Sequence, residues 1–205
     1  MIMATDRDDN AIRIFSVEST PFGSAFSEWC VRWLKWCLEQ PIESNPAKDM
    51  IGKKCCQNQS GPVWFLAGTF GGPATRKCTI PMKKAIMFPI IEKECSFAED
   101  RDITTESHLI SRTIDQTSRI SHLEASIDGL AVKDLGRYRV QTPVFDLVFP
   151  KNNVYSVQEG STRATSNGFW ILLEPLSAGE HKIYFKGVHR QPDFRTEVTY
   201  ELFIK

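Results

Sequence analysis

Apolar side chains recur with helical spacing between residues 25 and 39, and Pro41 ends the pattern. On a helix, the aromatic, leucine and cysteine residues of this segment gather on one side and the charged residues on the other. The apolar side consists of Phe26, Trp29, Cys30, Trp33, Leu34, Trp36 and Cys37. Aromatic side chains at this spacing usually pack in a core, although three tryptophans could instead form a box for an aromatic ligand. We expect the helix to dock this face onto a sheet.

Short apolar segments replace the helical spacing in the next part of the chain. After an irregular loop over residues 41–62, three apolar segments cover residues 63–70, 75–80 and 84–91. Their spacing predicts an antiparallel meander of three strands. The first and third segments are apolar on both faces, which is typical of central strands.

The C-terminal half repeats the strand signal, and Asp128-Gly129 marks a hairpin turn after the first segment. The predicted strands cover residues 123–127, 138–140, 145–149, 169–174, 181–186 and 195–204. Helical spacing returns only over residues 103–123, where Thr105 or Ser107 can cap a helix. A short strand is also predicted over residues 12–17.

These elements predict a mainly β (α+β) protein. We expect an antiparallel β-sandwich or jelly roll with an N-terminal aromatic-faced helix and one central helix. Residues 1–205 are expected to form a single compact domain. A division into a helix plus β-meander (1–105) and an immunoglobulin-like β unit (123–205) remains open.

Four segments carry a resemblance to known sequences: residues 59–72 (QSGPVWFLAGTFGG), 78–81 (CTIP), 88–91 (FPII) and 94–100 (ECSFAED). In these words the chain resembles a family of uncharacterised bacterial and archaeal proteins. The resemblance extends over about residues 15–204. It implies no activity, cofactor or binding residue.

The chain departs from that family's pattern at Met82-Lys83-Lys84, where a small residue, glycine and lysine are expected. A tight turn at this place normally uses glycine, because glycine adopts positive φ without strain. We therefore expect Lys83 to take positive φ or the loop to widen.

Charge excludes some partners. The 25 Lys and Arg residues balance the 25 Asp and Glu residues, so nothing favours nucleic acid, and no segment is long and apolar enough to span a membrane. The small basic cluster of Arg76, Lys77, Lys83 and Lys84 is interpreted as solvated hairpin tips. The partner remains unknown, and self-association through strand edges is the open alternative.

The acidic first ten residues do not form a signal peptide. This predicts a cytoplasmic protein, or a secreted one if a signal peptide has been removed.

All six cysteines lie in the first half of the chain. Reduced thiols are the default for a cytoplasmic protein. Cys55, Cys78 and Cys95 surround the predicted meander, so a disulfide between two of them is expected in an oxidising compartment. The adjacent Cys55 and Cys56 lack the spacing typical of zinc ligands, and no metal ligand is assigned.

Three other residues are candidates for ligand binding. Trp64 and Trp170 lie on predicted strands and could stack on a sugar, but their apolar neighbours favour burial in the core. His181 follows a turn at Gly179, where a histidine is commonly satisfied by backbone groups. The acids Glu92, Glu94, Glu99, Asp100 and Asp102 could surround a cation, although they lack the alternating spacing of a calcium loop.

Established catalytic signatures such as G-x-S-x-G, H-E-x-x-H and the P-loop are absent from the sequence. No catalytic residue is therefore assigned, and the cofactor is unknown. Our first hypothesis is a non-enzymatic binding or structural-interaction module. The alternative is an enzyme of unrecognised type, either a thiol-dependent hydrolase or a jelly-roll metal enzyme, using His181 with a cysteine or with acids of residues 92–106.

Overall fold

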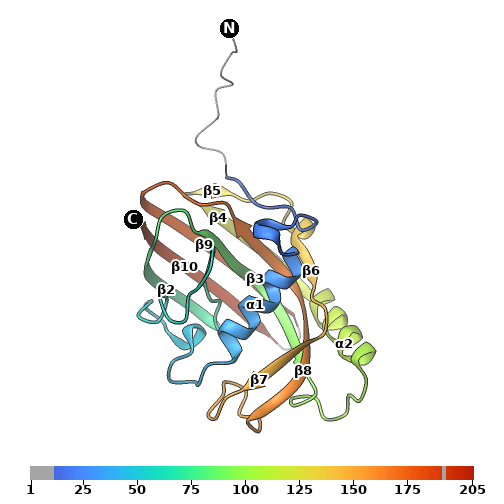
Figure 1. Cartoon of the computed structure of the whole chain (residues 1–205). Coiled ribbons are helices and arrows are strands. Elements are labelled where there is room, and N and C mark those ends of the chain that lie inside the picture. The colour runs from blue at the N-terminus through green and yellow to red at the C-terminus, as the bar shows by residue number, and fades with distance from the viewer. Residues whose placement is uncertain (1–11, 191–192) are drawn as a thin grey trace.

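Two five-stranded sheets pack face to face, and a helix covers the outer face of one of them (Figure 1). The computed structural model describes residues 12–190 and 193–205. The helices are α1 (Phe26–Leu38) and α2 (Glu106–Ser118), with 3-10 turns η1 (Pro21–Gly23), η2 (Pro46–Lys48) and η3 (Leu135–Tyr138). The strands are β1 (Val63–Phe65), β2 (Gly72–Ile80), β3 (Ala85–Ser96), β4 (Ile120–Ile127), β5 (Leu130–Ala131), β6 (Arg139–Gln141), β7 (Phe145–Phe149), β8 (Gly160–Leu173), β9 (Gly179–His189) and β10 (Phe194–Ile204).

The two sheets differ in what covers them. The helix-side sheet has the strand order β1-β3-β8-β6, with β7 also paired to β8, and α1 packs on its outer face. The far sheet has the order β2-β10-β9-β4-β5. The predicted mainly β sandwich with two helices is therefore confirmed.

The apolar core has two layers. Between α1 and the helix-side sheet, the Trp33 and Trp170 rings meet edge to face with centroids 5.3 Å apart. Between the two sheets, Phe88 stacks on Phe185 at 4.8 Å. The predicted apolar face of α1 is buried against the sheet as expected. Its three tryptophan N–H groups donate to the backbone carbonyls of Pro21, Leu66 and Gln57, which satisfies polar groups that burial would otherwise leave unpaired.

The predicted antiparallel meander is wrong. β1 pairs with β3 in parallel, whereas β2 crosses to the far sheet and pairs in parallel with β10. The physical reason is burial: β3 is apolar on both faces and must lie between α1 and the far sheet, whereas β2 alternates buried and exposed residues. β1 is also a short edge strand rather than a central one.

Each sheet combines strands from both halves of the chain. β3 pairs with β8 in the helix-side sheet, and β2 pairs with β10 in the far sheet. The segments 1–105 and 123–205 therefore share both sheets within the described residues, and neither segment holds a sheet of its own.

Two predictions about turns are confirmed, in contrast to the predicted strand pairing. Asp128-Gly129 joins β4 to β5 in a hairpin. Lys83 has φ +67°, as its non-glycine turn predicted. Helix α2 ends at Ser118, earlier than expected, because residues 120–127 form β4. Of the strand predicted over residues 12–17, only an isolated bridge from Ile14 to Leu173 is present.

A β-bulge interrupts β3 and sets the direction of the side chains that come after it. The pairing with β8 places Pro89 opposite Trp170 and Ile91 opposite Phe169, so Ile90 is an extra residue. Successive strand residues point to opposite faces, and one inserted residue reverses the alternation beyond it. As a result, Glu92 and Glu94 face α1, whereas strict alternation would turn them toward the far sheet.

Neither helix of the described residues has the length and apolar character needed to cross a membrane.

Two glycines make room for the bulge. A Cβ at Gly187 of β9 would lie 2.4 Å from Ile91 Cβ, and a Cβ at Gly168 of β8 would lie 2.3 Å from Glu92 Cβ. Both distances are far below van der Waals contact, and the obstructing atoms are next to the backbone. Strands β8 and β9 can therefore approach β3 at this place only because Gly168 and Gly187 have no side chain.

We predict that Gly187→Ala lowers the free energy of unfolding by about 2–3 kcal/mol, because the added methyl group overpacks the bulge. Urea unfolding measures this change. Gly136→Ala is the matched control, since its Cβ would meet no heavy atom within 4 Å, and its effect should stay within about 0.5 kcal/mol. Equal effects of the two substitutions would contradict the packing argument.

Candidate functional site

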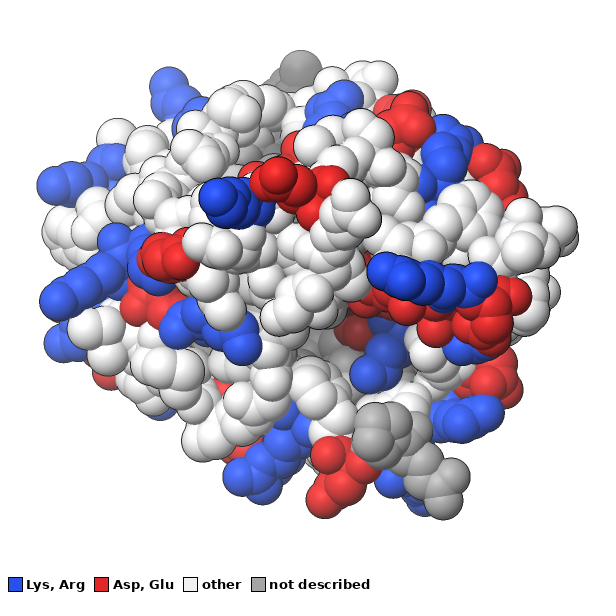
Figure 2. All heavy atoms as spheres, turned by 90° about the horizontal axis from the view of Figure 1, so that it is seen from below, with Lys and Arg blue, Asp and Glu red and all other residues white. Residues whose placement is uncertain are grey.

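A cavity of about 270 Å³ opens where β3 leaves its partner β1. Figure 2 views the molecule from below and shows a hollow with acidic and basic atoms inside it. The cavity is lined by Trp33, Cys37, Leu38, Ala47, Gly68, Thr69, Phe70, Pro89, Ile90, Ile91, Glu92, Lys93, Glu94, Glu99, Gln116, Tyr155, Phe194 and Thr196. Three carboxyl groups and four aromatic rings therefore share one small space, which we call the acidic cavity.

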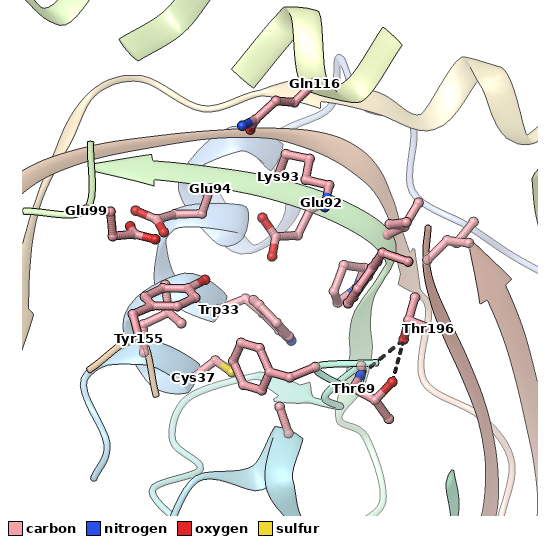
Figure 3. Close-up of a pocket in the computed structure, with 18 residues that line it drawn as sticks. Trp33, Cys37, Thr69, Glu92, Lys93, Glu94, Glu99, Gln116, Tyr155 and Thr196 are labelled. Atoms are coloured by element: carbon pink, nitrogen blue, oxygen red, sulfur yellow. Dashed lines mark hydrogen bonds between the residues drawn. The ribbon is translucent and has the colours of Figure 1, made fainter. Parts of the chain in front are cut away.

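The bulge in β3 sends neighbouring charged side chains in different directions. Glu92 and Glu94 point from β3 toward Trp33 and Tyr155 (Figure 3). Lys93 lies between them in sequence, and its Nζ lies 4.6 Å from the centroid of the Phe194 ring. Strand β3 thus supplies two of the three acids that line the cavity.

Glu92 is held by a hydroxyl group from the neighbouring strand. Ser166 of β8 donates a hydrogen bond of 2.8 Å from Oγ to Glu92 Oε2. Burial raises the pKa of Glu92 to about 7, although the Ser166 hydrogen bond and the charge of Lys93 oppose the rise. Glu92 therefore changes its protonation state near neutral pH.

The carboxyl group of Glu94 accepts no comparable hydrogen bond. Each of its carboxyl oxygens is almost fully buried, and neither accepts a hydrogen bond from the described residues. The Glu99 carboxyl faces it (Figure 3), but two ionised carboxylates have no hydrogen to share. Burial and then the charge of Glu99 raise the pKa of Glu94 well above its ordinary value.

Glu99 enters the cavity from the turn that follows β3. Its Oε2 accepts a 2.7 Å hydrogen bond from Ser96 Oγ. Burial raises its pKa, while hydrogen bonds from Glu94 and Ser96 act in the opposite direction. A protonated Glu94 beside a hydrogen-bonded Glu99 is the arrangement that this geometry favours.

The opposite wall is aromatic and carries a thiol. The Tyr155 ring packs edge to face on Phe70 and on Phe149, each at 5.9 Å. Burial raises the pKa of the Tyr155 hydroxyl and of the Cys37 thiol. Since the thiolate is the nucleophilic form of cysteine, Cys37 is poorly suited to the role of a nucleophile.

A buried arginine binds the backbone of two residues that line the cavity. Arg76 of β2 is 1% exposed, which corrects its interpretation as part of a solvated basic tip. Its guanidinium group donates to Tyr200 Oη at 2.8 Å and to several carbonyls. The carbonyls belong to Ala47, Asp49, Ala67 and Gly68. Two of these residues, Ala47 and Gly68, also line the cavity.

The two aspartates of the acidic segment 92–106 pair with a helix residue. Arg112 of α2 binds Asp100 at 3.3 Å and Asp102 at 3.2 Å. Among the described residues, the only group of three or more histidine, cysteine, aspartate or glutamate ligands within 4.8 Å of one another is Cys55, Cys56 and Cys78. The structure therefore does not support the alternative in which all five acids surround one cation.

Both tryptophans singled out in the sequence are core residues. Trp64 is 7% exposed and lies between the sheets, and Trp170 is 0% exposed and lies beneath α1. Neither ring has an accessible face for a sugar. Their indole N–H groups have no hydrogen-bond partner among the described residues.

His181 lies on the far sheet and does not line the acidic cavity. Its Nδ1 lies 2.7 Å from Asp128 Oδ2, and its Nε2 lies 3.0 Å from the Ser177 carbonyl oxygen. Cys78 lines the same surface hollow, but Leu202 of the intervening strand separates the two residues. Cys78 is also bonded to Cys55, so it has no thiol to pair with His181.

The three cysteines considered for a disulfide, Cys55, Cys78 and Cys95, differ in their bonding. Cys55 and Cys78 form a disulfide with their Cα atoms 5.9 Å apart. Cys95 is a buried thiol whose Sγ donates to Asp100 Oδ2 at 2.8 Å. Cys95 lies apart from the other two because β3 belongs to the helix-side sheet and β2 to the far sheet.

No motif in the sequence predicts the acidic cavity. Its acids lie within residues 92–99, directly after an apolar strand. The only local signal of the bulge is the consecutive apolar pair Ile90-Ile91 after Pro89, and a pair of this kind also occurs in regular buried strands.

We predict that Glu92→Gln stabilises the protein above neutral pH. The folded pKa of about 7 lies above the unfolded value, so the folded state loses stability as pH rises from about 4 to 7. Removing the charge should add on the order of 2 kcal/mol at pH 8 and little at pH 4. Thermal or urea unfolding at several pH values tests this, with the exposed Glu180→Gln as control. A pH-independent effect would contradict it.

Comparisons of the chain with protein-family models, with curated proteins and with solved structures gave no match.

Proposed function

We propose that the protein binds a small organic cation, an ammonium or guanidinium compound, in the acidic cavity. The observation that carries the proposal is the buried carboxyl group of Glu94, whose two oxygens accept no hydrogen bond from the described residues. A buried carboxyl oxygen without a hydrogen-bond donor costs free energy, most of all in the ionised form. A ligand that brings N–H donors and positive charge would remove this cost, and it would bind most tightly where the cost is greatest.

The size of the cavity limits the ligand. Pockets for drug-sized molecules start at about 300 Å³, so a cavity of 270 Å³ suits a smaller compound. Aromatic rings of Trp33, Phe70 and Tyr155 lie on the same lining as the acids. Organic cations are attracted both to carboxylates and to aromatic faces, which explains why these two kinds of side chain serve one ligand.

The charge balance also favours a cation. The lining holds three glutamates and one basic residue, Lys93. Burial lowers the pKa of Lys93, and its ammonium group already lies over Phe194. An arriving cation would favour the ionised forms of Glu92 and Glu94, so binding should release protons and strengthen as pH rises through about 7.

The test is a comparison of matched ligands. Isothermal titration calorimetry should detect benzylamine or 1,4-diaminobutane more readily than benzyl alcohol or 1,4-butanediol, which have similar shape and no charge. Glu94→Gln should weaken cation binding at least about tenfold, because it removes a buried charged partner. Tryptophan fluorescence gives a second readout, since Trp33 lines the cavity.

Glu180→Gln is the control for net charge and should bind as the wild type does. Tighter binding of the neutral alcohols, or cation binding unchanged in Glu94→Gln, would contradict the proposal. Circular dichroism establishes that the variants are folded.

A second candidate function is general acid–base catalysis, which corresponds to an enzyme of unrecognised type. The observation that favours it is the pKa of Glu92, about 7, because acid–base catalysts work best with a pKa near the operating pH. Glu94 and Glu92 would then act as acid and base, since their environments raise their pKa values unequally.

Hydrolysis of a panel of chromogenic glycosides and esters tests this second candidate. Activity should show a pH limb near 7 and should fall at least about 100-fold in Glu92→Gln. Activity retained by Glu92→Gln would remove Glu92 from the mechanism.

A further inference from the structure

Three cysteine sulfurs lie together on the far sheet, apart from the acidic cavity. Cys55 and Cys56 come from the loop before β1, and Cys78 comes from β2. Their Sγ atoms all lie within 4.8 Å of one another, and Cys55 Sγ and Cys56 Sγ are 3.6 Å apart. We call Cys55, Cys56 and Cys78 the thiol cluster.

The backbone brings these sulfurs together without help from the disulfide. The loop pairs with β2 through the Lys77 N–H, which donates to the Ile51 carbonyl at 3.1 Å. Gly52 has φ +94°, and a Cβ there would lie 2.2 Å from the Lys77 carbonyl oxygen. Only glycine allows this approach, so the chain itself presses the loop onto the strand that carries Cys78.

Further hydrogen bonds hold the loop beyond the cluster. Gln59 Nε2 donates to the Cys55 carbonyl at 2.9 Å and to the Phe65 carbonyl at 2.8 Å. The Asp49 carboxylate accepts the backbone N–H groups of Ile51 and Lys54. None of these contacts uses a cysteine sulfur, so we expect them to hold the three sulfurs close together in the reduced protein as well.

We infer that the reduced thiol cluster is a binding site for a soft d10 metal ion, and specifically Cu(I). The ligand set contains sulfur only, since no carboxylate or imidazole belongs to the group. Thiolates select Cu(I) over the hard cations that carboxylates prefer, and three thiolates complete the trigonal coordination of Cu(I). Zn(II) prefers four ligands, so the cluster leaves it one ligand short.

The exposure of the three cysteines also gives a metal ion a path into the thiol cluster. Cys56 is exposed, whereas Cys55 and Cys78 are buried. An incoming ion can therefore meet Cys56 first and then reach the two buried sulfurs. The adjacency of Cys55 and Cys56, which argued against a zinc site in the sequence, is no obstacle here because the loop turns both sulfurs toward β2.

Metal binding and the disulfide exclude each other, since both use the sulfurs of Cys55 and Cys78. A dithiol such as dithiothreitol reduces the bond with two electrons and two protons, giving two cysteine thiols and a cyclic disulfide of the reductant. Binding of Cu(I) then releases the thiol protons of its ligands. The site is consequently available only in the reduced protein.

A Cu(I) titration of the full chain tests the inference. The protein is reduced with dithiothreitol, desalted without oxygen and titrated with Cu(I) in competition with the chromophoric chelator bicinchoninate. We expect one Cu(I) per chain and no uptake by the oxidised protein. Zn(II) should bind more weakly than Cu(I).

The decisive variant is Cys56→Ser. It keeps both partners of the disulfide, so its oxidised form should still lose the mass of two hydrogens, but its Cu(I) affinity should fall at least about 100-fold. Cys95→Ser, which removes a thiol outside the cluster, should bind Cu(I) as the wild type does. Absence of Cu(I) uptake by the reduced wild type, or equal affinity in Cys56→Ser, would overturn the inference.

Discussion

The extra residue in β3 is the constraint on which the acidic cavity depends. Before the bulge, Met87 faces α1 and Phe88 faces the far sheet. The insertion of Ile90 reverses this alternation, so Glu92 and Glu94 appear on the helix side, where the sequence alone would place them against the far sheet. The same insertion needs close approach of two other strands, which Gly168 and Gly187 permit. The site thus depends on backbone positions that never touch a ligand.

Two buried charged groups near the cavity illustrate the difference between structural and functional polarity. Arg76 donates to four carbonyls and to Tyr200, so its burial is compensated in full by the fold. Glu94 is also buried, but neither of its oxygens accepts a hydrogen bond from the described part of the chain. Because an unpaired buried group lowers stability, the proposed cation would supply at Glu94 the partners that the fold itself supplies to Arg76.

Much of the fold could be predicted from local patterns, and the exceptions have a common cause. The apolar face of α1, the Asp128-Gly129 hairpin and the positive φ of Lys83 all depend on neighbouring residues, so the sequence reveals them. The pairing of β1 with β3 and of β2 with β10 depends on which faces are covered at a distance. The bulge, and with it the acidic cavity, belongs to this second class. The sequence left the pairing among Cys55, Cys78 and Cys95 open, because the approach of Cys55 to Cys78 depends on the loop folding back onto β2.

The segment from η2 to β1 contributes to both the acidic cavity and the thiol cluster, which raises the question of whether one site affects the other. Ala47 lines the cavity, and Cys55 belongs to the cluster. Between them, Arg76 binds the Asp49 carbonyl, and the Asp49 carboxylate binds the Ile51 and Lys54 N–H groups. These hydrogen bonds fix the backbone on the cavity side, while Gly52 fixes it against Lys77 on the thiol side. The thiol cluster and Ala47 are therefore joined through one hydrogen-bond network, and residues that share such a network are energetically coupled rather than independent.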